Sequence, residues 1–211
     1  MIRKLISFAF PFTRIVKSEY NGNLELTTIF GKTFLNTANT NYSYGSLQKV
    51  LKFSLKQIDV TKAEHILVLG LGGGSVLKTL RTDFKFAGRI TAVDIDPVII
   101  EISKNEFGIS NNENTSVVCA DALDYLTGTL EKFDILIIDL FIDNRIPARF
   151  LTETFWCEVI NRLKNKGTII FNMLNSQHFS IQIVENVLRK HGLVWKIFRE
   201  VEKTNNILIA Y

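Results

Sequence analysis

The sequence predicts an α/β protein with a doubly wound, mostly parallel sheet, preceded by a small antiparallel sheet. Three observations support this prediction. A short apolar run at residues 66–69 leads into a glycine cluster and a helical pattern, which is typical of a buried parallel strand and its crossover helix. Strand and helix patterns then alternate along the chain, as they do in parallel sheets. Residues 193–201 and 206–211 form a predicted hairpin, which would make the last strand antiparallel.

The first 58 residues are expected to form an N-terminal region of their own. Residues 13–40 are rich in strand signals, with glycine-containing turns between them. Residues 47–58 carry an apolar face at helical spacing, so a helix is expected to link this small sheet to the rest of the chain. We place the domain boundary between residues 58 and 59, and we assign residues 59–211 to the α/β domain.

The elements of the α/β domain follow from apolar runs, turn residues and helix caps. Strands are predicted at residues 66–69, 89–96, 116–120, 133–138 and 168–172, before the terminal hairpin. Helices are predicted from Val76 onward and at residues 98–105, 122–126, 152–163 and 180–191. Pro97 suits the first turn of the second of these helices, and Gly108 suits its end. A turn at residues 165–167 is expected to separate the fourth helix from the fifth strand.

The glycine cluster is the first candidate for a binding site. Gly70, Gly72, Gly73 and Gly74 lie between a predicted strand and a predicted helix. Glycines let the backbone turn sharply and approach a ligand closely, and the free N–H groups of a helix N-terminus attract an anionic group. This arrangement is typical of nucleotide binding, although a tight turn without a ligand would carry the same residues.

Aspartates stand at the ends of the next three predicted strands. They are Asp94, Asp121 and Asp139, and the first lies 24 residues after Gly70, which fits an acid that binds a ribose. Ligands of open α/β sheets bind outside the carboxyl ends of the strands. Any one of these aspartates could be an ordinary helix N-cap, but three of them together with the glycine cluster favour a nucleotide site.

Composition narrows the class of protein. The 211 residues are 46% hydrophobic, which is ample for a large core, and the net charge of +4 comes from scattered side chains, so nucleic acid is not an expected partner. Cys119 and Cys157 lie in apolar contexts and are expected to be buried free thiols. Histidines and cysteines have no metal-ligand spacing, and no segment is long enough to span a membrane. We expect a cytoplasmic, homodimeric enzyme without a metal.

The terminal hairpin distinguishes between two kinds of nucleotide-binding fold. Dinucleotide-dependent dehydrogenases continue with a second βαβαβ half, whereas this chain ends in a hairpin. The chain therefore resembles the S-adenosylmethionine-dependent methyltransferases, which implies a seven-stranded, class I Rossmann-like fold. Within that superfamily it is similar to the spermidine synthase, or polyamine aminopropyltransferase, branch over nearly its whole length. Residues 17–26, 41–47 and 139–153 carry this similarity.

The resemblance implies a transferase whose donor is S-adenosylmethionine or decarboxylated S-adenosylmethionine. In this chain Asp94 would bind the ribose hydroxyls, Asp121 with the Ala122 backbone would bind the adenine edge, and Asp139 would lie beside the sulfonium. Tyr42 and Tyr44 would contact the acceptor. The full set of donor-binding residues would be Gly70, Gly72, Gly73, Gly74, Asp94, Ile95, Asp121, Ala122 and Asp139.

Three departures from the family pattern bear on the reaction. Aminopropyltransferases have an acid in the glycine turn, where this chain has Gly73, and a second acid three residues after the Asp139 position, where it has Ile142. A further glutamate of the family is replaced by Ser46. These acids hold the donor amine and activate the acceptor amine, and charged hydrogen bonds contribute about 1.5–3 kcal/mol each. Asp143 stands one residue late and would be a second catalytic group only if the loop bulges; otherwise it belongs to a solvated turn.

We therefore expect methyl transfer from S-adenosylmethionine to a small-molecule acceptor, with an amine among the candidates. Two alternatives stay open. One is aminopropyl transfer from decarboxylated S-adenosylmethionine to a diamine, as in polyamine biosynthesis. The other is a nucleoside-binding interaction protein without catalysis.

Overall fold

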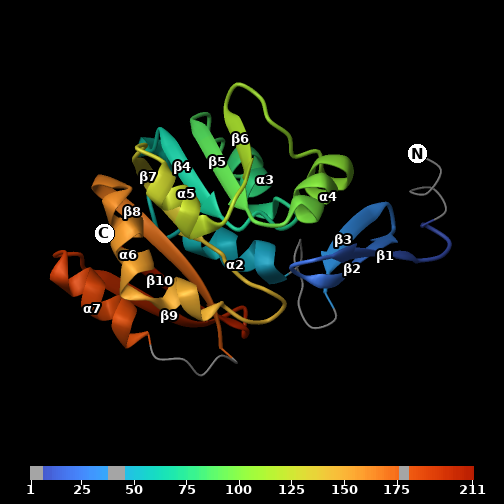
Figure 1. Ribbon diagram of the computed structural model, residues 1–211. Helices are drawn as coiled ribbons and strands as arrows, with labels where there is room; N and C mark the ends of the chain where they lie inside the picture. Colours follow the sequence, from blue (N-terminus) through green and yellow to red (C-terminus); the bar gives the residue numbers. More distant parts are fainter. Residues whose placement is uncertain (1–6, 38–45, 176–180) are drawn as a thin grey trace.

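A computed structural model describes residues 7–37, 46–175 and 181–211 and contains two β-sheets (Figure 1). The larger sheet consists of β4 (His65–Leu69), β5 (Arg89–Asp94), β6 (Thr115–Cys119), β7 (Phe133–Ile138), β8 (Leu163–Leu174), β9 (Trp195–Val201) and β10 (Asn205–Ala210). Its strand order is β6-β5-β4-β7-β8-β10-β9. The strands from β6 to β8 in this order are parallel, and β10 is antiparallel to both of its neighbours. The predicted doubly wound, mostly parallel sheet of seven strands is thus confirmed.

The side chains of the central strands alternate between two hydrophobic clusters, one on each face of the sheet. On one face, Leu67, Leu136 and Phe171 pack with α5 (Ala122–Gly128), α6 (Glu153–Asn161) and α7 (Gln182–Lys190). On the other face, Val68 and Ile137 pack with α2 (Ser46–Leu55) and α3 (Ser75–Thr82). Successive residues of a strand point to opposite faces, so these uniformly apolar strands need cover on both sides.

The smaller sheet is antiparallel and consists of β1 (Phe12–Ser18), β2 (Gly22–Ile29) and β3 (Lys32–Asn36), in that order. Its Leu24, Leu26 and Leu35 pack against Ile99 and Ile102 of α4 (Pro97–Phe107). The predicted N-terminal antiparallel sheet is therefore confirmed. The domain boundary after residue 58 stays a prediction, and α2 belongs by its packing to the larger sheet.

Asp96 fastens the smaller sheet to α4. This fully buried residue is the N-cap of the helix, and its Oδ1 accepts a hydrogen bond from the Val98 amide at 2.9 Å. Its Oδ2 accepts hydrogen bonds from Asn21 Nδ2 at 2.7 Å and from Ser18 Oγ. Ser18 and Asn21 flank the turn between β1 and β2, so one carboxylate joins this turn to the first turn of α4.

The structure differs from the predicted elements in three places. β8 begins at Leu163, so the turn expected at residues 165–167 lies inside a strand. The reason is a bulge, because Leu163 pairs with Phe133, the register then shifts, and Lys166 adopts a left-handed φ of 63°. The helix expected over residues 152–163 is α6, which ends at Asn161 because β8 begins two residues later, and a 3-10 turn (Ala148–Leu151) precedes it. Cys119 is exposed, contrary to expectation, because it is the last residue of the edge strand β6.

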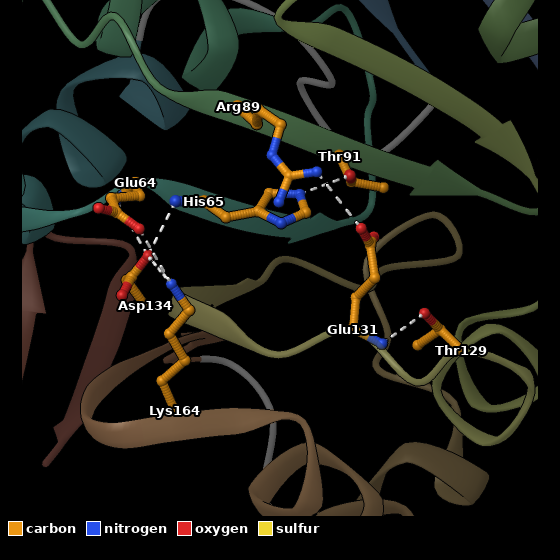
Figure 2. A network of polar contacts seen from close by, with 8 residues as sticks. All are labelled: Glu64, His65, Arg89, Thr91, Thr129, Glu131, Asp134 and Lys164. Carbon is orange, nitrogen blue, oxygen red and sulfur yellow. Dashed lines mark hydrogen bonds and ion pairs between the residues drawn. The ribbon is translucent and has the colours of Figure 1, made fainter.

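Figure 2 shows a polar network toward the amino ends of the parallel strands, with Glu64, His65, Arg89, Thr91, Thr129, Glu131, Asp134 and Lys164. Asp134 Oδ2 accepts hydrogen bonds from the His65 amide at 2.8 Å and from Lys164 Nζ at 3.0 Å, which ties β4 and β8 to β7. The His65 ring makes a 2.9 Å hydrogen bond with Thr91 Oγ1, and burial lowers the pKa of His65. These contacts align the strands at the edge opposite to the strand-end aspartates.

Among the helices of residues 7–37, 46–175 and 181–211, none combines the length and the hydrophobicity that a membrane span requires.

Candidate active site

A cavity of about 480 Å³ lies at the carboxyl ends of the parallel strands. Its borders are the segments that follow β4, β5, β6 and β7, the end of β8, the start of β10, part of α2 and the turn between β1 and β2. The predicted donor-binding residues that line it are Gly70, Gly72, Asp94, Ile95, Asp121, Ala122 and Asp139. The fold thus gathers segments that are far apart in the chain, as open α/β sheets do.

Two of the glycines after β4 are required by packing. Gly70 has a φ of 93°, and a Cβ atom at this position would lie 2.1 Å from the backbone oxygen of Asp139. Gly74, the N-cap of α3, has a φ of 72°, and its Cβ atom would lie 2.4 Å from Ile109 Cγ1. Only glycine permits such approaches in a left-handed conformation. Gly73 and Gly74 are not among the described residues that line the cavity, so their contact with a donor stays a prediction.

Asp94 holds the glycine turn in place. Its Oδ2 accepts hydrogen bonds from the amides of Leu71 at 2.9 Å and Gly72 at 3.4 Å, and its Oδ1 accepts one from the Asp96 amide at 3.0 Å. Burial raises the pKa of Asp94, and these amides oppose the rise. A carboxylate oxygen accepts about two hydrogen bonds, so Oδ2 is already satisfied, whereas Oδ1 can still accept one from a hydroxyl group in the cavity.

Asp121 caps α5 and presents one oxygen to a cation. Its Oδ1 accepts hydrogen bonds from the Leu123 amide at 2.8 Å and the Asp124 amide at 3.3 Å. Its Oδ2 is buried and receives no hydrogen bond, although Arg149 Nη2 forms an ion pair with it at 2.7 Å. The Arg149 guanidinium also lies over the Phe150 ring, 4.7 Å from the centroid. Arg149 lies in the 3-10 turn before α6, and no sequence pattern marks it, because a single exposed arginine forms no motif.

Asp139 lies at the floor of the cavity, at the end of a chain of amides. Asn172 Nδ2 donates to Asp139 Oδ1 at 2.8 Å, and Asn205 Nδ2 donates to Asn172 Oδ1 at 2.8 Å. Thr204 Oγ1 donates to Asn205 Oδ1 at 2.7 Å. Burial raises the pKa of Asp139 to about 6, the hydrogen bond from Asn172 lowers it, and the charge of Asp94 raises it. The sequence signals these contacts only by an asparagine next to an apolar run in each strand: Asn172 follows residues 169–171, and Asn205 precedes residues 207–210.

The sequence analysis singled out two positions in the loop after β7, Ile142 and Asp143, and only Ile142 is among the described residues that line the cavity. Ile142 lines the cavity, so one position that departs from the family pattern presents an apolar side chain there. Asp143 is not among the described lining residues; it has a left-handed φ of 52°, and its Oδ1 accepts a hydrogen bond from Thr37 Oγ1 at 2.5 Å. The catalytic role of Asp143 therefore stays a prediction. Tyr42 and Tyr44 lie outside the described residues.

The strand order arranges the polar groups along one line. Asp121 follows β6, Asp94 ends β5, Gly70 follows β4 and Asp139 follows β7. Neighbouring strands lie about 4.8 Å apart, so the three steps from β6 to β7 span about 14 Å. Beyond them, the ends of β8 and β10 carry asparagines, Thr204 and Lys203. The cavity is therefore elongated, with carboxylates along one part and amides with a lysine at the other end.

Known proteins similar to this chain include transferases of two kinds. The family model described as spermine/spermidine synthase domain matches residues 48–204. A polyamine aminopropyltransferase of Vibrio vulnificus is 31% identical over 118 residues, which are 54% of this chain and 39% of that protein. The eEF1A lysine and N-terminal methyltransferase of Mus musculus is 31% identical over 121 residues, which are 52% of this chain and 17% of that protein. The matched part spans less than half of either relative.

A solved structure agrees with the fold over most of the chain. Human methyltransferase-like protein 13 in complex with SAH superimposes with a TM-score of 0.58 at 26% sequence identity. The match covers 78% of this chain and 78% of that chain. Proteins named for aminopropyl transfer and for methyl transfer are thus both similar to this chain.

Proposed function

Because the chain belongs to the spermine/spermidine synthase domain family, we propose that it is a transferase that binds S-adenosylmethionine and transfers the methyl group to a small-molecule acceptor. The observation that carries this proposal is the convergence of Asp94, Asp121 and Asp139 on one cavity beside the glycine turn. These carboxylates lie about one strand spacing or more apart. They match the three polar regions of a nucleoside sulfonium, which are the adenine amino group, the ribose hydroxyls and the positive sulfur.

Asp121 supplies the best support for an adenine site. Its Oδ2 is buried and is held by the ion pair with Arg149 at 2.7 Å, and the exocyclic amino group of adenine could take the place of that cation as the N–H donor. Arg149 pairs with this oxygen, but its side chain is 46% exposed, so the guanidinium can turn toward solvent when a base binds. Asp94 lies nearer the glycine turn and keeps one lone pair, on Oδ1, for a ribose hydroxyl.

Asp139 is the proposed catalytic residue. A bound sulfonium donor supplies an activated carbon, and transfer breaks one C–S bond and leaves the electron pair on sulfur. With a pKa of about 6, Asp139 is mostly ionised at pH 7, so it can stabilise the positive charge and accept the proton that an amine nucleophile releases. Asn172 orients the carboxylate. Positioning supplies much of the rate in such a transfer, so a single base is sufficient.

Aminopropyl transfer from decarboxylated S-adenosylmethionine is the second candidate. The family and the Vibrio vulnificus relative favour it. The apolar Ile142 in the cavity disfavours it, because a polyamine enzyme needs carboxylates to compensate its ammonium groups. A nucleoside-binding protein without catalysis is the third candidate. The homodimer, the cytoplasmic location and the lack of a nucleic-acid partner stay predictions.

Two measurements separate these candidates. Calorimetry with S-adenosylmethionine, decarboxylated S-adenosylmethionine and S-adenosylhomocysteine tests the donor site, and binding of none of them would overturn the proposal. Incubation with donor labelled in the methyl group or in the aminopropyl group, together with a panel of amines, then identifies the group transferred. Binding without transfer of either label would favour the non-catalytic candidate.

A further inference from the structure

The end of the cavity beyond Asp139 is formed by the end of β8 and the turn between β9 and β10. Asn175 and Lys203 line it. The turn is closed by a hydrogen bond from the Thr204 amide to the Val201 carbonyl at 3.2 Å. Its two central residues, Glu202 and Lys203, have left-handed φ values of 51° and 66°, which ordinary side chains adopt only at an energetic cost. Asn175 holds the turn in place, because its backbone N–H donates a hydrogen bond to the Thr204 carbonyl oxygen at 2.8 Å.

The charge at this end of the cavity is positive. No ion pair of Lys203 occurs within the described part of the chain, and the neighbouring acid, Glu202, pairs instead with Lys49 at 3.9 Å. Of the described residues that line the cavity, the only acids are the three strand-end aspartates. The segments at residues 38–45 and 176–180 contain no aspartate or glutamate, so neither can add a carboxylate. The second ammonium group of a diamine would therefore meet a lysine instead of an acid.

Asn175 adds a hydrogen-bond acceptor to the same end of the cavity. Its Nδ2 donates to the Lys203 carbonyl at 3.3 Å, whereas its Oδ1 is buried and has no partner in the described structure. A buried amide oxygen of this kind normally has a donor. A ligand that occupies this end would satisfy it with an N–H group, while the lysine ammonium would bind an anion.

We propose that this end of the cavity binds the acceptor, and that the acceptor is an amine that carries one anionic group, a carboxylate or a phosphate, and not a diamine. The inference rests on the proposed function, because it takes the donor to lie along the three aspartates. Lys203 binds the anionic group, and the N–H groups of the amine donate to Asn175 and to the carboxylate of Asp139. Specificity arises because the lysine attracts this acceptor and repels a diamine.

Calorimetry on protein saturated with S-adenosylhomocysteine tests this assignment. The three probes are 4-aminobutyrate, 3-aminopropyl phosphate and putrescine, which share an aminoalkyl chain of similar length and differ in the second group. At least one anionic probe is expected to bind about threefold to fivefold more tightly than putrescine, because Lys203 is exposed and an exposed ion pair contributes up to about 1 kcal/mol. The better of the two anionic probes distinguishes a carboxylate acceptor from a phosphate acceptor.

Lys203→Asn and Glu202→Asn form a matched pair of variants. Asparagine tolerates the left-handed conformation of both positions, so both variants are expected to fold, and thermal unfolding checks this. Lys203→Asn is expected to weaken binding of the anionic probe about threefold to fivefold and to leave the affinity for S-adenosylhomocysteine unchanged. Glu202→Asn is expected to leave both affinities unchanged, because Glu202 does not line the cavity.

Several results would overturn the inference. The first is that putrescine binds more tightly than both anionic probes. The second is that neither anionic probe binds. The third is that Lys203→Asn binds the anionic probe as tightly as the wild-type protein does. Weaker binding of S-adenosylhomocysteine by Lys203→Asn would also overturn it, because Lys203 would then hold the carboxylate of the donor. Failure of the wild-type protein to bind S-adenosylhomocysteine in the first step is a separate result, and it contradicts the proposed function itself.

Discussion

Asn172 donates a 2.8 Å hydrogen bond to the carboxylate of Asp139, and this contact joins the ends of β7 and β8 beneath the cavity. Asn172 is fully buried, so both ends of its amide need partners, and Asn205 supplies the other one. The arrangement fixes the orientation of a carboxylate that burial alone would drive toward its neutral form.

Replacement of Asn172 by alanine is expected to raise the pKa of Asp139 above its value of about 6, because the donated hydrogen bond lowers that pKa. A hydrogen bond of about 1 kcal/mol corresponds to a shift of about 0.7 pKa units. NMR titration of labelled aspartates measures the shift directly, and the acidic limb of the rate profile should move to higher pH with it. Thr204→Val, which alters a more distant link of the same chain, should shift the pKa less. A fall in the pKa of Asp139 in Asn172→Ala would contradict the role assigned to this amide.

Asp139→Asn is expected to abolish transfer and to stabilise the fold at pH 8. The folded-state pKa of about 6 lies above the ordinary value of 3.8, so the folded protein binds the proton more tightly than the unfolded chain does. Ionisation of Asp139 therefore destabilises the fold as the pH rises from about 4 to about 6, by about 3 kcal/mol in total. Urea unfolding should show a gain of about 3 kcal/mol at pH 8 and of about 1 kcal/mol at pH 4.5. An equal gain at both pH values would show that the carboxylate is not responsible.

The parts of the fold that were predicted correctly are those that neighbouring residues determine. β7 has its predicted bounds, Phe133–Ile138, because an apolar run interrupted only by Asp134 and bounded by polar residues defines a buried strand. α4 begins at Pro97 and ends before Gly108, which has a φ of 72°, because both caps act locally. The start of β8 was wrong, because it depends on the pairing of Leu163 with the distant Phe133.

The candidate site shows the same limit. The strand-end aspartates were predictable as a group, since the carboxyl ends of parallel strands meet at one edge. Asn172 was not, because its partners Asp139 and Asn205 are each 33 residues away in sequence. The pairing of Arg149 with Asp121 likewise depends on a tertiary contact, here between a 3-10 turn and a helix N-cap.

Asp121 is expected to select adenine through the exocyclic amino group. S-inosylhomocysteine, in which a carbonyl replaces that group, should bind at least about tenfold more weakly than S-adenosylhomocysteine, because two hydrogen-bond acceptors would then face each other. Arg149→Ala removes the cation that pairs with Asp121 Oδ2, so it should strengthen binding of the adenosine form by about twofold to fivefold. Titration calorimetry measures both effects. Equal affinities for the two ligands would show that Asp121 does not contact the base.

The wild-type protein is expected to bind S-adenosylmethionine more tightly than its decarboxylated form. The two donors differ in one carboxylate, and the free N–H groups at the start of α3 favour an anion. An acid at position 73, as in the aminopropyltransferases that the sequence resembles, would repel that carboxylate and attract the lone amine. Here the position is Gly73, so the chain lacks the group that selects against the ordinary donor.

Gly73→Asp should shift the ratio of the two affinities toward the decarboxylated donor by about tenfold, as expected for one charged contact. The substitution is feasible because Gly73, unlike Gly70, Gly72 and Gly74, does not have a positive φ. Gly73→Asn has the same shape without the charge, so it should shift the ratio much less and serves as the control. Competition binding with both donors measures the ratio in each variant. If the wild-type protein binds the decarboxylated donor more tightly, the glycine does not set the preference, and aminopropyl transfer becomes the better proposal.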